Sequence, residues 1–444
     1  MNNILIIGAG RSSYPLIDYV LQKAAREGWF VTVADTIPEK AQRQISNHSN
    51  SRAVWLDVTK SNDRKDLINR SDVVVSLLPA HLHLEVAHDC IKLNKPVLTA
   101  ASITHEMYRL GDEARDRELV FTGEYVLDPG LDHMAAKREL DDIRAKGGKI
   151  KSFKAYNGGL LAYDDTDNPW KYKLTWNPRN VVLAGQGTAQ FLKKNKIRYI
   201  TYHQLFQQTK SLDIPGLGSY EAYANRDSLL FREIYGLEGV PNIYRGTIRP
   251  IGFCDAWNAL IQLGLTDGDF PILHSGKISY YELLDGVTGK QPGNTLKERV
   301  ANLLGVEVNG DVIKKLHWLG LFSKRKIKLA TASPALILEH LLREKWPLEE
   351  KDRDGLIVHF EIVYELDGRK RRRQSTMMLE GEDTRNTAMA KVLGLPIAIL
   401  LKLLMQGKIE SKGAGVSVSP QAYGPVLQEL ESYGIQFQTT DQIA

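Results

Sequence analysis

The chain has 444 residues, of which 25% are charged and 43% hydrophobic, and its net charge is +5. This composition is that of an ordinary folded protein with room for two or three domains, without the wide basic face that nucleic-acid binding needs. The two cysteines, Cys90 and Cys254, cannot build a disulfide framework and lack metal-ligand spacing. No apolar run is long enough to cross a membrane and no secretory signal pattern is present. We therefore expect no nucleic-acid, metal or membrane partner, and a reducing, cytoplasmic setting.

The first segment, residues 3–11, reads as a strand, a tight turn and the start of a helix. Its apolar run ends at Gly8-Ala9-Gly10, and an amphipathic segment follows from Ser13 to Glu27. Glycines at such a turn let the backbone approach a pyrophosphate at the helix N-terminus. Because the third motif position is Ser13, a strand–helix turn without nucleotide stays an alternative at this point.

The second strand-like segment, residues 30–35, ends in Asp35. In a dinucleotide-binding fold, an acid at this place accepts hydrogen bonds from the ribose 2′-OH and repels a 2′-phosphate. No arginine follows directly to hold such a phosphate. Asp35 therefore predicts NAD as the cofactor, with NADP possible.

Further short apolar segments alternate with helix-like ones, at residues 53–58, 71–79, 96–100 and 118–123. This alternation predicts an α/β fold with a doubly wound parallel sheet, and ligands bind at the carboxyl ends of such strands. The sixth strand is followed by Asp128-Pro129-Gly130 and then by Asp132 and His133. Turn chemistry explains the proline and glycine but not the acids, so we expect Asp128 to be functional. His133 is more simply a capping or packing residue.

The pattern changes after residue 148. Residues 149–156 alternate as a strand, and residues 157–160 are expected to bend the chain. A loop at residues 163–173 combines aromatic, acidic and basic side chains, a composition that suits binding. Arginines 226, 245 and 249 could pair with carboxylates through their planar guanidinium groups, although solvated surface positions are the simpler alternative.

Two features characterise the end of the chain. Asp367-Gly368 lies between two strand-like segments and predicts a hairpin, so this part should be antiparallel. Residues 387–407 form an apolar helical stretch that we expect to pack against another element or subunit.

Together these motifs resemble the saccharopine reductase family, the glutamate-forming saccharopine dehydrogenases, over nearly the whole chain. The resemblance implies a Rossmann domain, a mixed α/β domain with an antiparallel sheet and a small helical insertion, and a homodimer. It also implies interconversion of saccharopine with α-aminoadipate semialdehyde and glutamate in lysine metabolism, by hydride transfer with a nicotinamide cofactor. The motifs that carry it are Gly8–Gly10, Ser76–His81, Leu127–His133, Tyr156–Leu160, Asn168–Lys173 with Trp176, Asn225–Ser228, Arg245–Arg249 and Thr387–Lys391.

The resemblance also implies which residues form the site. Asp128 would be catalytic, because it could hold a protonated amine or relay a proton beside the nicotinamide. The substrate, a small amino acid, would contact Ala101, Ser102, Leu127, Asp128, Arg226, Thr247, Ile248 and Arg249, and we add Asn157 at an altered pocket position. The cofactor would contact Ala9, Gly10, Arg11, Ser12, Ala34, Asp35, Asp57, Val58, Leu78, Pro79 and Val126, and we add Gly8 from the glycine turn.

Three parts of the chain are expected. Residues 1–132 would form the Rossmann domain, and residues 133–386 the substrate-binding and dimerisation domain with its helical insertion at about 175–265. Residues 387–444 would form a helical segment that packs back on the core.

The sequence departs from the family pattern at several presumed pocket positions, namely Ala101, Ser102, Tyr125, Val126, Asn157 and Tyr163. Two alternatives therefore stay open. One is a related reductive-amination, opine-type enzyme with another amino acid or carbonyl substrate, and the other is a non-catalytic dinucleotide-binding protein.

Overall fold

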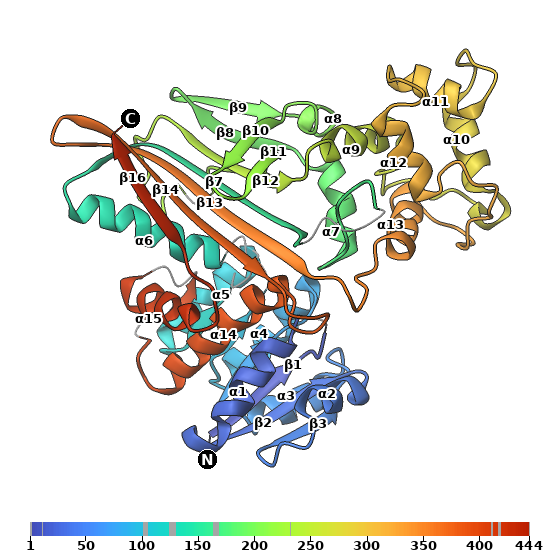
Figure 1. Cartoon of the computed structure of the whole chain (residues 1–444). Coiled ribbons are helices and arrows are strands. Elements are labelled where there is room, and N and C mark those ends of the chain that lie inside the picture. The colour runs from blue at the N-terminus through green and yellow to red at the C-terminus, as the bar shows by residue number, and fades with distance from the viewer. Residues whose placement is uncertain are drawn as a thin grey trace. The chain divides into compact units, whose positions relative to one another are not determined.

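The computed structural model describes residues 2–10, 12–100, 105–123, 130–162, 168–230, 232–409, 412–415 and 419–443 (Figure 1). The chain divides into two compact units. Unit 1 comprises Met1–Ala145 and Met377–Gln438, and unit 2 comprises Lys146–Thr376 and Thr439–Ala444. Much of the C-terminal sequence therefore belongs to the same unit as the N-terminus.

Unit 1 is built on a seven-stranded sheet in the order β15-β6-β5-β4-β1-β2-β3, and every pair in it is parallel. Its strands are β1 (Asn2–Ile7), β2 (Trp29–Asp35), β3 (Ser51–Trp55), β4 (Val73–Ser76), β5 (Val97–Thr99), β6 (Val120–Thr122) and β15 (Gly413–Gly415). The order of the first six strands is that of a Rossmann fold, in which the strand order, but not the chain direction, reverses between β1 and β4. The predicted doubly wound parallel sheet is confirmed.

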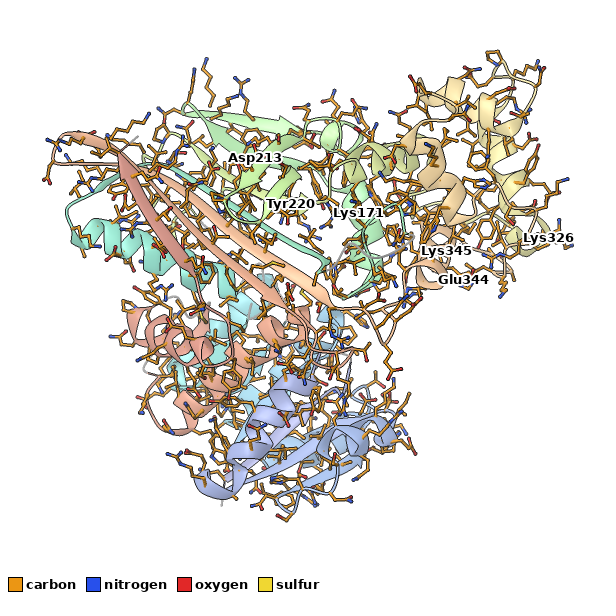
Figure 2. All side chains as sticks on the ribbon, in the orientation of Figure 1. Lys171, Asp213, Tyr220, Lys326, Glu344 and Lys345 are labelled. Atoms are coloured by element: carbon orange, nitrogen blue, oxygen red, sulfur yellow. The ribbon has the colours of Figure 1, made fainter. Side chains whose placement is uncertain are left out.

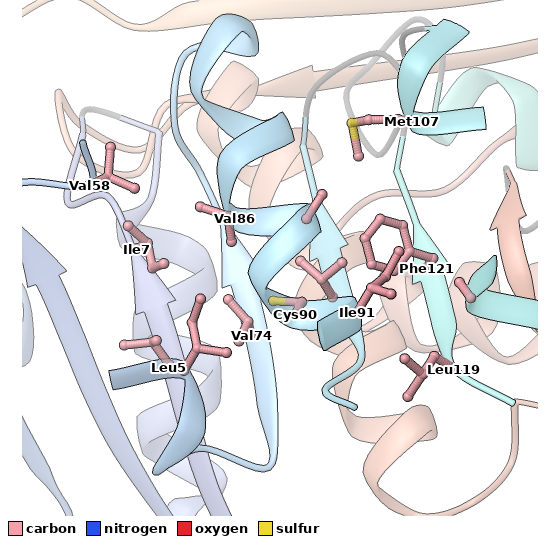
Figure 3. Close-up of a cluster of buried hydrophobic side chains, with 14 of the residues drawn as sticks. Leu5, Ile7, Val58, Val74, Val86, Cys90, Ile91, Met107, Leu119 and Phe121 are labelled. Atoms are coloured by element: carbon pink, nitrogen blue, oxygen red, sulfur yellow. The ribbon is translucent and has the colours of Figure 1, made fainter. Parts of the chain in front are cut away.

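The helices of unit 1 are α1 (Tyr14–Glu27), α2 (Pro38–Ile45), α3 (Ser61–Asn69), α4 (His83–Lys92), α5 (His105–Asp116), α6 (Leu131–Ala145), α14 (Ala388–Met405) and α15 (Pro420–Glu431). Helices α3, α4 and α5 cover one face of the sheet. Ile68, Val86 and Met107 from these helices join an apolar core with Leu5 and Val74 from the strands (Figure 3). Buried strands with this apolar character explain the short hydrophobic segments of the sequence.

Helix α14 packs against α1 within unit 1. A Cβ atom on Gly394 would lie 2.9 Å from the backbone nitrogen of Leu16, so glycine permits the close approach. By length and composition α14 could cross a membrane, so our expectation that no apolar run is long enough is wrong for this segment, but most of its residues are buried inside unit 1. Its apolarity is thus explained by core packing.

Unit 2 contains a nine-stranded sheet, in which β10-β11-β12-β7-β13-β14-β16 form the main path and β8 and β9 form a side branch. Its strands are β7 (Lys149–Leu161), β8 (Ala189–Lys193), β9 (Lys196–Ile200), β10 (Lys210–Ile214), β11 (Gly218–Ala224), β12 (Ile243–Arg249), β13 (Asp354–Leu366), β14 (Arg369–Glu380) and β16 (Gln438–Ile443). Asp367 and Gly368 both have positive φ between β13 and β14, as a type I′ hairpin turn requires. The predicted hairpin is confirmed.

The expected bend at residues 157–160 is wrong, because β7 continues through this segment to Leu161. The glycine has another purpose. A Cβ atom on Gly158 would lie 2.4 Å from the carbonyl oxygen of Ile248 in the neighbouring strand β12. Gly158 therefore marks a close approach of two strands and not a turn.

We predict that Gly158→Ala destabilises unit 2 by about 1–3 kcal/mol, because the added methyl group would force β7 and β12 apart. Chemical unfolding would measure the change. Gly286→Ala is a matched control in the same unit, since a Cβ atom there meets no heavy atom within 4 Å. In helix α10 (Tyr280–Thr288) this alanine should be neutral or stabilising by up to about 1 kcal/mol. Equal effects of the two substitutions would contradict the packing argument.

The helices of unit 2 are α7 (Pro178–Leu183), α8 (Tyr202–Leu205), α9 (Phe253–Gln262), α10 (Tyr280–Thr288), α11 (Leu296–Leu304), α12 (Asp311–Leu319) and α13 (Pro334–Lys345). Residues 175–265, where we expected the helical insertion, hold strands β8–β12 as well as α7–α9. The continuous run of helices follows, from α9 to α13. Local signals set its boundaries, such as the capping box of Ser279 and Glu282 at the start of α10. Glu344, which Figure 2 labels, lies near the end of α13. It forms an ion pair with Arg325 at 2.6 Å.

Candidate functional site

The glycine turn of unit 1 lies at the carboxyl end of β1, beside the point where the strand order reverses. Gly8 has a φ of +108°, and a Cβ atom there would lie 3.1 Å from the carbonyl oxygen of Leu77. Both facts require glycine. Gly10 is exposed, and a Cβ atom on it would meet no heavy atom within 4 Å. The turn thus leaves open space in front of the N-terminus of α1, where a pyrophosphate is expected.

Asp35 ends β2 and contacts the glycine turn directly. Its Oδ2 accepts a hydrogen bond from the Ala9 N–H at 2.8 Å, and its Oδ1 accepts one from the Ile37 N–H at 2.9 Å. The carboxylate therefore fixes the turn as well as the loop after β2. Each oxygen has a second lone pair, so Asp35 can still accept hydrogen bonds from a ribose. Ala34, beside it, is fully buried.

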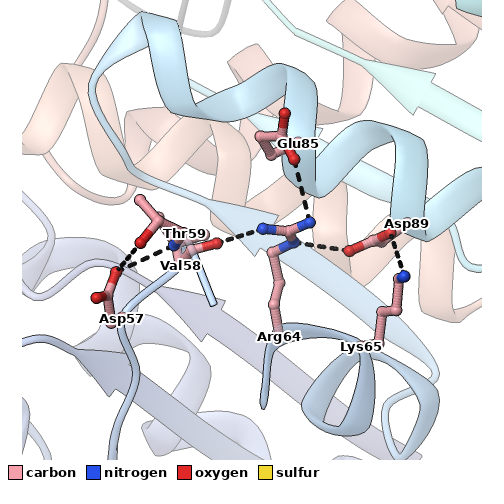
Figure 4. Close-up of polar contacts among 7 residues, drawn as sticks. All are labelled: Asp57, Val58, Thr59, Arg64, Lys65, Glu85 and Asp89. Carbon is pink, nitrogen blue, oxygen red and sulfur yellow. Dashed lines mark hydrogen bonds and ion pairs between the residues drawn. The ribbon is translucent and has the colours of Figure 1, made fainter. Parts of the chain in front are cut away.

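Asp57 and Val58 follow the end of β3, and a hydrogen bond from Arg64 of α3 holds this segment in place (Figure 4). Asp57 Oδ1 accepts hydrogen bonds from the Thr59 N–H and hydroxyl, which lower the pKa of Asp57. The guanidinium of Arg64 donates to the carbonyl oxygen of Val58 and to Asp89, the latter at 2.7 Å. Arg64 and Asp89 are both buried, so the pair needs this complete set of partners.

Leu78 and Pro79 follow the end of β4, where His83 joins two strand ends. The His83 Nδ1 lies 2.8 Å from the hydroxyl of Ser76 and 3.0 Å from that of Thr99, the last residues of β4 and β5. His83 also hydrogen-bonds the backbone of Leu78. The buried imidazole thus holds the predicted cofactor-binding loop against both strands.

Burial lowers the pKa of His83 to about 4, from about 6.5 in the unfolded chain. The unfolded state therefore takes up the proton first as the pH falls. We predict that protonation of His83 in the unfolded state lowers the free energy of unfolding as the pH falls from about 6.5 to 4, by up to about 3 kcal/mol. In urea unfolding along a pH series, the free energy of unfolding should fall less steeply toward acid pH for His83→Gln than for wild type. His88→Gln, an exposed change on the same helix, is the control. Parallel curves for wild type and His83→Gln would exclude this role.

In unit 2, three of the predicted substrate-binding residues share one face of the sheet. Asn157 on β7 and Thr247 on β12 are register partners, and Arg249 lies two residues beyond Thr247 on the same face. Ile248 alternates to the opposite face and is fully buried. Its side chain therefore does not join the other three.

Arg249 is the most unusual charge on this face. Its side chain is only 5% exposed, and its guanidinium lies 5.1 Å from the ring of Tyr172, 5.7 Å from Tyr223 and 5.2 Å from Phe253. Its Nη1 donates to the carbonyl of Ile248 at 3.0 Å. Among the described residues no carboxylate pairs with it, and its Nε has no hydrogen-bond acceptor. Aromatic faces attract the cation but supply no countercharge.

The other predicted site residues have different settings. Arg226 is exposed in the loop after β11, with a φ of +40°. His133 is completely buried in α6, and burial lowers its pKa to about 3, as the packing alternative expects. Ser12 lies between the turn and α1, partly buried. The remaining predictions fall outside the described residues, namely Arg11, Ala101, Ser102, Tyr125, Val126, Leu127, Asp128 and Tyr163, so the catalytic role of Asp128 stays a prediction.

Sequence reasoning missed three residues that fix the strand ends, Gln44, Arg64 and His83. Each sits on a helix and reaches a partner that is distant in sequence, for example 35 residues from Gln44 to Ala9 and 25 from Arg64 to Asp89. A polar residue on an otherwise ordinary helix gives no local signal of such a contact. The one hint in the sequence is the position of His83, which follows the Leu-Leu-Pro segment at the expected ligand-binding edge of the sheet.

Two family models match this chain. The Saccharopine dehydrogenase NADP binding domain matches residues 4–121, and the Saccharopine dehydrogenase C-terminal domain matches residues 126–435. With its glycine turn and Rossmann sheet, the chain is thus of the class of nicotinamide-dinucleotide-dependent oxidoreductases. It belongs to the saccharopine dehydrogenase family, which confirms the resemblance.

Individual relatives agree with this assignment. The chain is 32% identical to saccharopine dehydrogenase (NADP(+), L-glutamate-forming) of Saccharomyces cerevisiae, with 98% of both chains covered. It is 31% identical to alpha-aminoadipic semialdehyde synthase of Arabidopsis thaliana, covering 98% of this chain but only 44% of that longer protein. The structure of apo saccharopine dehydrogenase (L-Glu forming) from S. cerevisiae matches with a TM-score of 0.89 and 30% identity, covering 99% of this chain and 100% of that chain.

Proposed function

We propose that this chain interconverts saccharopine with α-aminoadipate semialdehyde and glutamate, as a saccharopine reductase of lysine metabolism. In the oxidative direction, the carbon beside the secondary amine gives up its hydrogen as hydride, which leaves an imine. Water then splits this imine into aldehyde and glutamate. The bound nicotinamide cofactor would accept the hydride. The similarity to yeast saccharopine dehydrogenase, which extends over both whole chains, supports this substrate.

The structural observation that carries the proposal is Arg249. Among the described residues its buried guanidinium meets no carboxylate, and such a charge is costly because it has lost water without gaining a counterion. Saccharopine has three carboxylates, and one of them would complete this site through a bidentate pair. Asn157 and Thr247 on the same face would add neutral hydrogen bonds. Asp128 would hold the amine or relay its proton, which follows from the resemblance.

The proposed reaction has a direct test. Purified protein with saccharopine and NAD⁺ or NADP⁺ should form reduced cofactor, which absorption at the nicotinamide band measures. No turnover with either cofactor would exclude the proposal. Turnover with a different pair of amino acid and carbonyl compound would support the opine-type alternative instead. Cofactor binding without turnover across an amino-acid panel would leave a non-catalytic protein.

We further propose that NAD is preferred over NADP, because the Asp35 carboxylate would repel a 2′-phosphate. Asp35→Ala should reduce the preference for NAD over NADP by about 10–100-fold. This range is expected when charged hydrogen bonds to the ribose are lost and the repulsion of a 2′-phosphate is removed. It should also weaken both cofactors somewhat, since the Ala9 N–H loses its acceptor. Ratios of kcat/KM for the two cofactors measure the effect. A wild-type enzyme that already prefers NADP would contradict this reading.

We also propose a homodimer in a cytoplasmic setting, with a small amino acid as the substrate and without nucleic-acid or membrane partners. The free, buried Cys90 and Cys254 are compatible with a reducing compartment. Light scattering coupled to size-exclusion chromatography would test the dimer, and a monomer at micromolar concentration would contradict it.

A further inference from the structure

Gln44 on helix α2 makes a set of contacts to the glycine turn for which the dinucleotide-binding pattern does not account. Its side-chain Nε2 donates to the carbonyl oxygen of Ala9 at 3.0 Å and to that of Gly10 at 3.1 Å. Its Oε1 lies 2.9 Å from the hydroxyl of Ser13, which also lies 2.8 Å from the carbonyl oxygen of Gly10. One amide thus engages two consecutive carbonyls and the first turn of α1.

The contact to the Ala9 carbonyl fixes the orientation of the peptide plane between Ala9 and Gly10. In a trans peptide the C=O and the next N–H are coplanar and point in opposite directions. Because Gln44 holds the Ala9 carbonyl on its own side, the Gly10 N–H must point to the other side.

The surroundings of the Gly10 N–H suit a group that donates a hydrogen bond to a ligand. The neighbouring N–H groups have acceptors, since that of Gly8 donates to Ala34 and that of Ala9 donates to Asp35. Within the described chain, Gly10 N–H has none. Gly10 is also exposed, with open space at its Cβ position. An anion placed there would accept this hydrogen bond without any rearrangement.

We propose that Gln44 is a positioning residue for the cofactor pyrophosphate. It holds the peptide plane between Ala9 and Gly10 so that the Gly10 N–H already faces the anion before the cofactor binds. The inference rests on the dinucleotide-binding role of unit 1 and does not depend on which amino acid is the substrate. The benefit is preorganisation, because a turn that is already ordered loses less entropy on binding.

The decisive variant is Gln44→Met, which keeps the length of the side chain but removes both donors. The dissociation constants of ADP-ribose, which contains the pyrophosphate, and of adenosine, which lacks it, are measured by calorimetry. We expect ADP-ribose and NADH to bind about tenfold more weakly, the effect of about 1.4 kcal/mol, while adenosine stays within about twofold. A residue that merely supported the fold would weaken both ligands equally.

Gln44→Glu adds a matched test, because it replaces the amide NH2 with a carboxylate oxygen of the same shape. The carboxylate would face two carbonyl oxygens and repel the pyrophosphate, so ADP-ribose should bind at least as weakly as to Gln44→Met. Gln42→Glu makes the same charge change two residues away on α2, where Gln42 is exposed and donates only to the Ser46 carbonyl. This control should stay within about twofold of wild type, because residues two apart on a helix do not face each other and the exposed Gln42 side chain lies in water.

Three results with the variants would overturn the proposal: ADP-ribose affinity that Gln44→Met leaves unchanged, an equal loss for adenosine, or an equal effect of Gln42→Glu. If Gln44→Met does not fold, Gln44→Asn is used instead, since it keeps the amide on a shorter side chain. The ratio of the affinities for ADP-ribose and adenosine then decides in the same way. Wild-type protein that binds no ADP-ribose would also refute it. A wild type that binds ADP-ribose but does not turn over saccharopine would remove the proposed reaction alone.

Discussion

Arg249→Met is expected to lower kcat/KM for saccharopine by about 100-fold, equivalent to about 2.7 kcal/mol, with most of the effect in the KM for saccharopine. The physical reason is the environment of the guanidinium, which is buried among three rings without a carboxylate partner in the described chain. A substrate carboxylate would supply the missing charge in a place from which water is excluded. Steady-state kinetics with saccharopine as the varied substrate measures the loss.

The same substitution should have little effect on stability. Removing the cation gives up cation–π attraction and the hydrogen bond to the Ile248 carbonyl, but it also removes the cost of a buried charge that meets no carboxylate among the described residues, and these effects oppose each other. We therefore expect the free energy of unfolding to change by less than about 2 kcal/mol. Arg249→Lys keeps the charge and loses the planar fork, so its kcat/KM should be intermediate. Arg198→Met, on exposed strand β9, is the control that should change neither. Unchanged kinetics in Arg249→Met would exclude the substrate role.

Gly8→Ala is expected to impair both stability and cofactor binding. At a φ of +108° an alanine is strained, and its Cβ would press on the carbonyl oxygen of Leu77 at 3.1 Å. We expect a loss of about 1–3 kcal/mol in the free energy of unfolding from this strain. Displacement of the turn should lower kcat/KM for the cofactor by about 100-fold, as misplacement by about 1 Å can do. Urea unfolding and cofactor kinetics measure the two effects.

Gly10→Ala separates these two effects. Its Cβ atom has open space, so stability should change by less than about 1 kcal/mol. The methyl group would nonetheless occupy the space in front of the turn, and cofactor affinity should fall. If Gly10→Ala binds NADH as wild type does, the pyrophosphate does not lie in front of this turn.

The Rossmann half of the fold was predictable because its signals are local. Short apolar runs, the Gly8–Gly10 turn and an acid at position 35 each lie within one strand or strand–helix unit, and buried parallel strands leave such runs in the sequence. The Asp367-Gly368 hairpin was predictable for the same reason, since a type I′ turn needs two residues that tolerate positive φ. The family also followed from motifs that can be read in order along the chain.

Unit 2 was less accessible to this reasoning. Gly158 looked like a bend residue, whereas it sits inside β7 because Ile248, 90 positions later in the chain, approaches it across the sheet. Strands β8–β12 occupy much of the segment expected to be a helical insertion. Strand pairing between distant segments overrides local preference, and single-sequence patterns do not record which strands will pair.

The sequence by itself determined that a dinucleotide-binding turn begins the chain, that Asp35 stands beside it, and that Arg249 is a carboxylate-binding candidate. These conclusions depend on residue type and spacing over a few positions. Only the tertiary structure decided that Arg249 is enclosed by Tyr172, Tyr223 and Phe253, and that Gln44 holds the glycine turn from another helix. The burial of Arg249 depends on Tyr223 and Tyr172, which lie 26 and 77 positions away in the chain, a separation at which local periodicity carries no information. The chemistry of the side chains was readable in advance, while their environment was set by the fold.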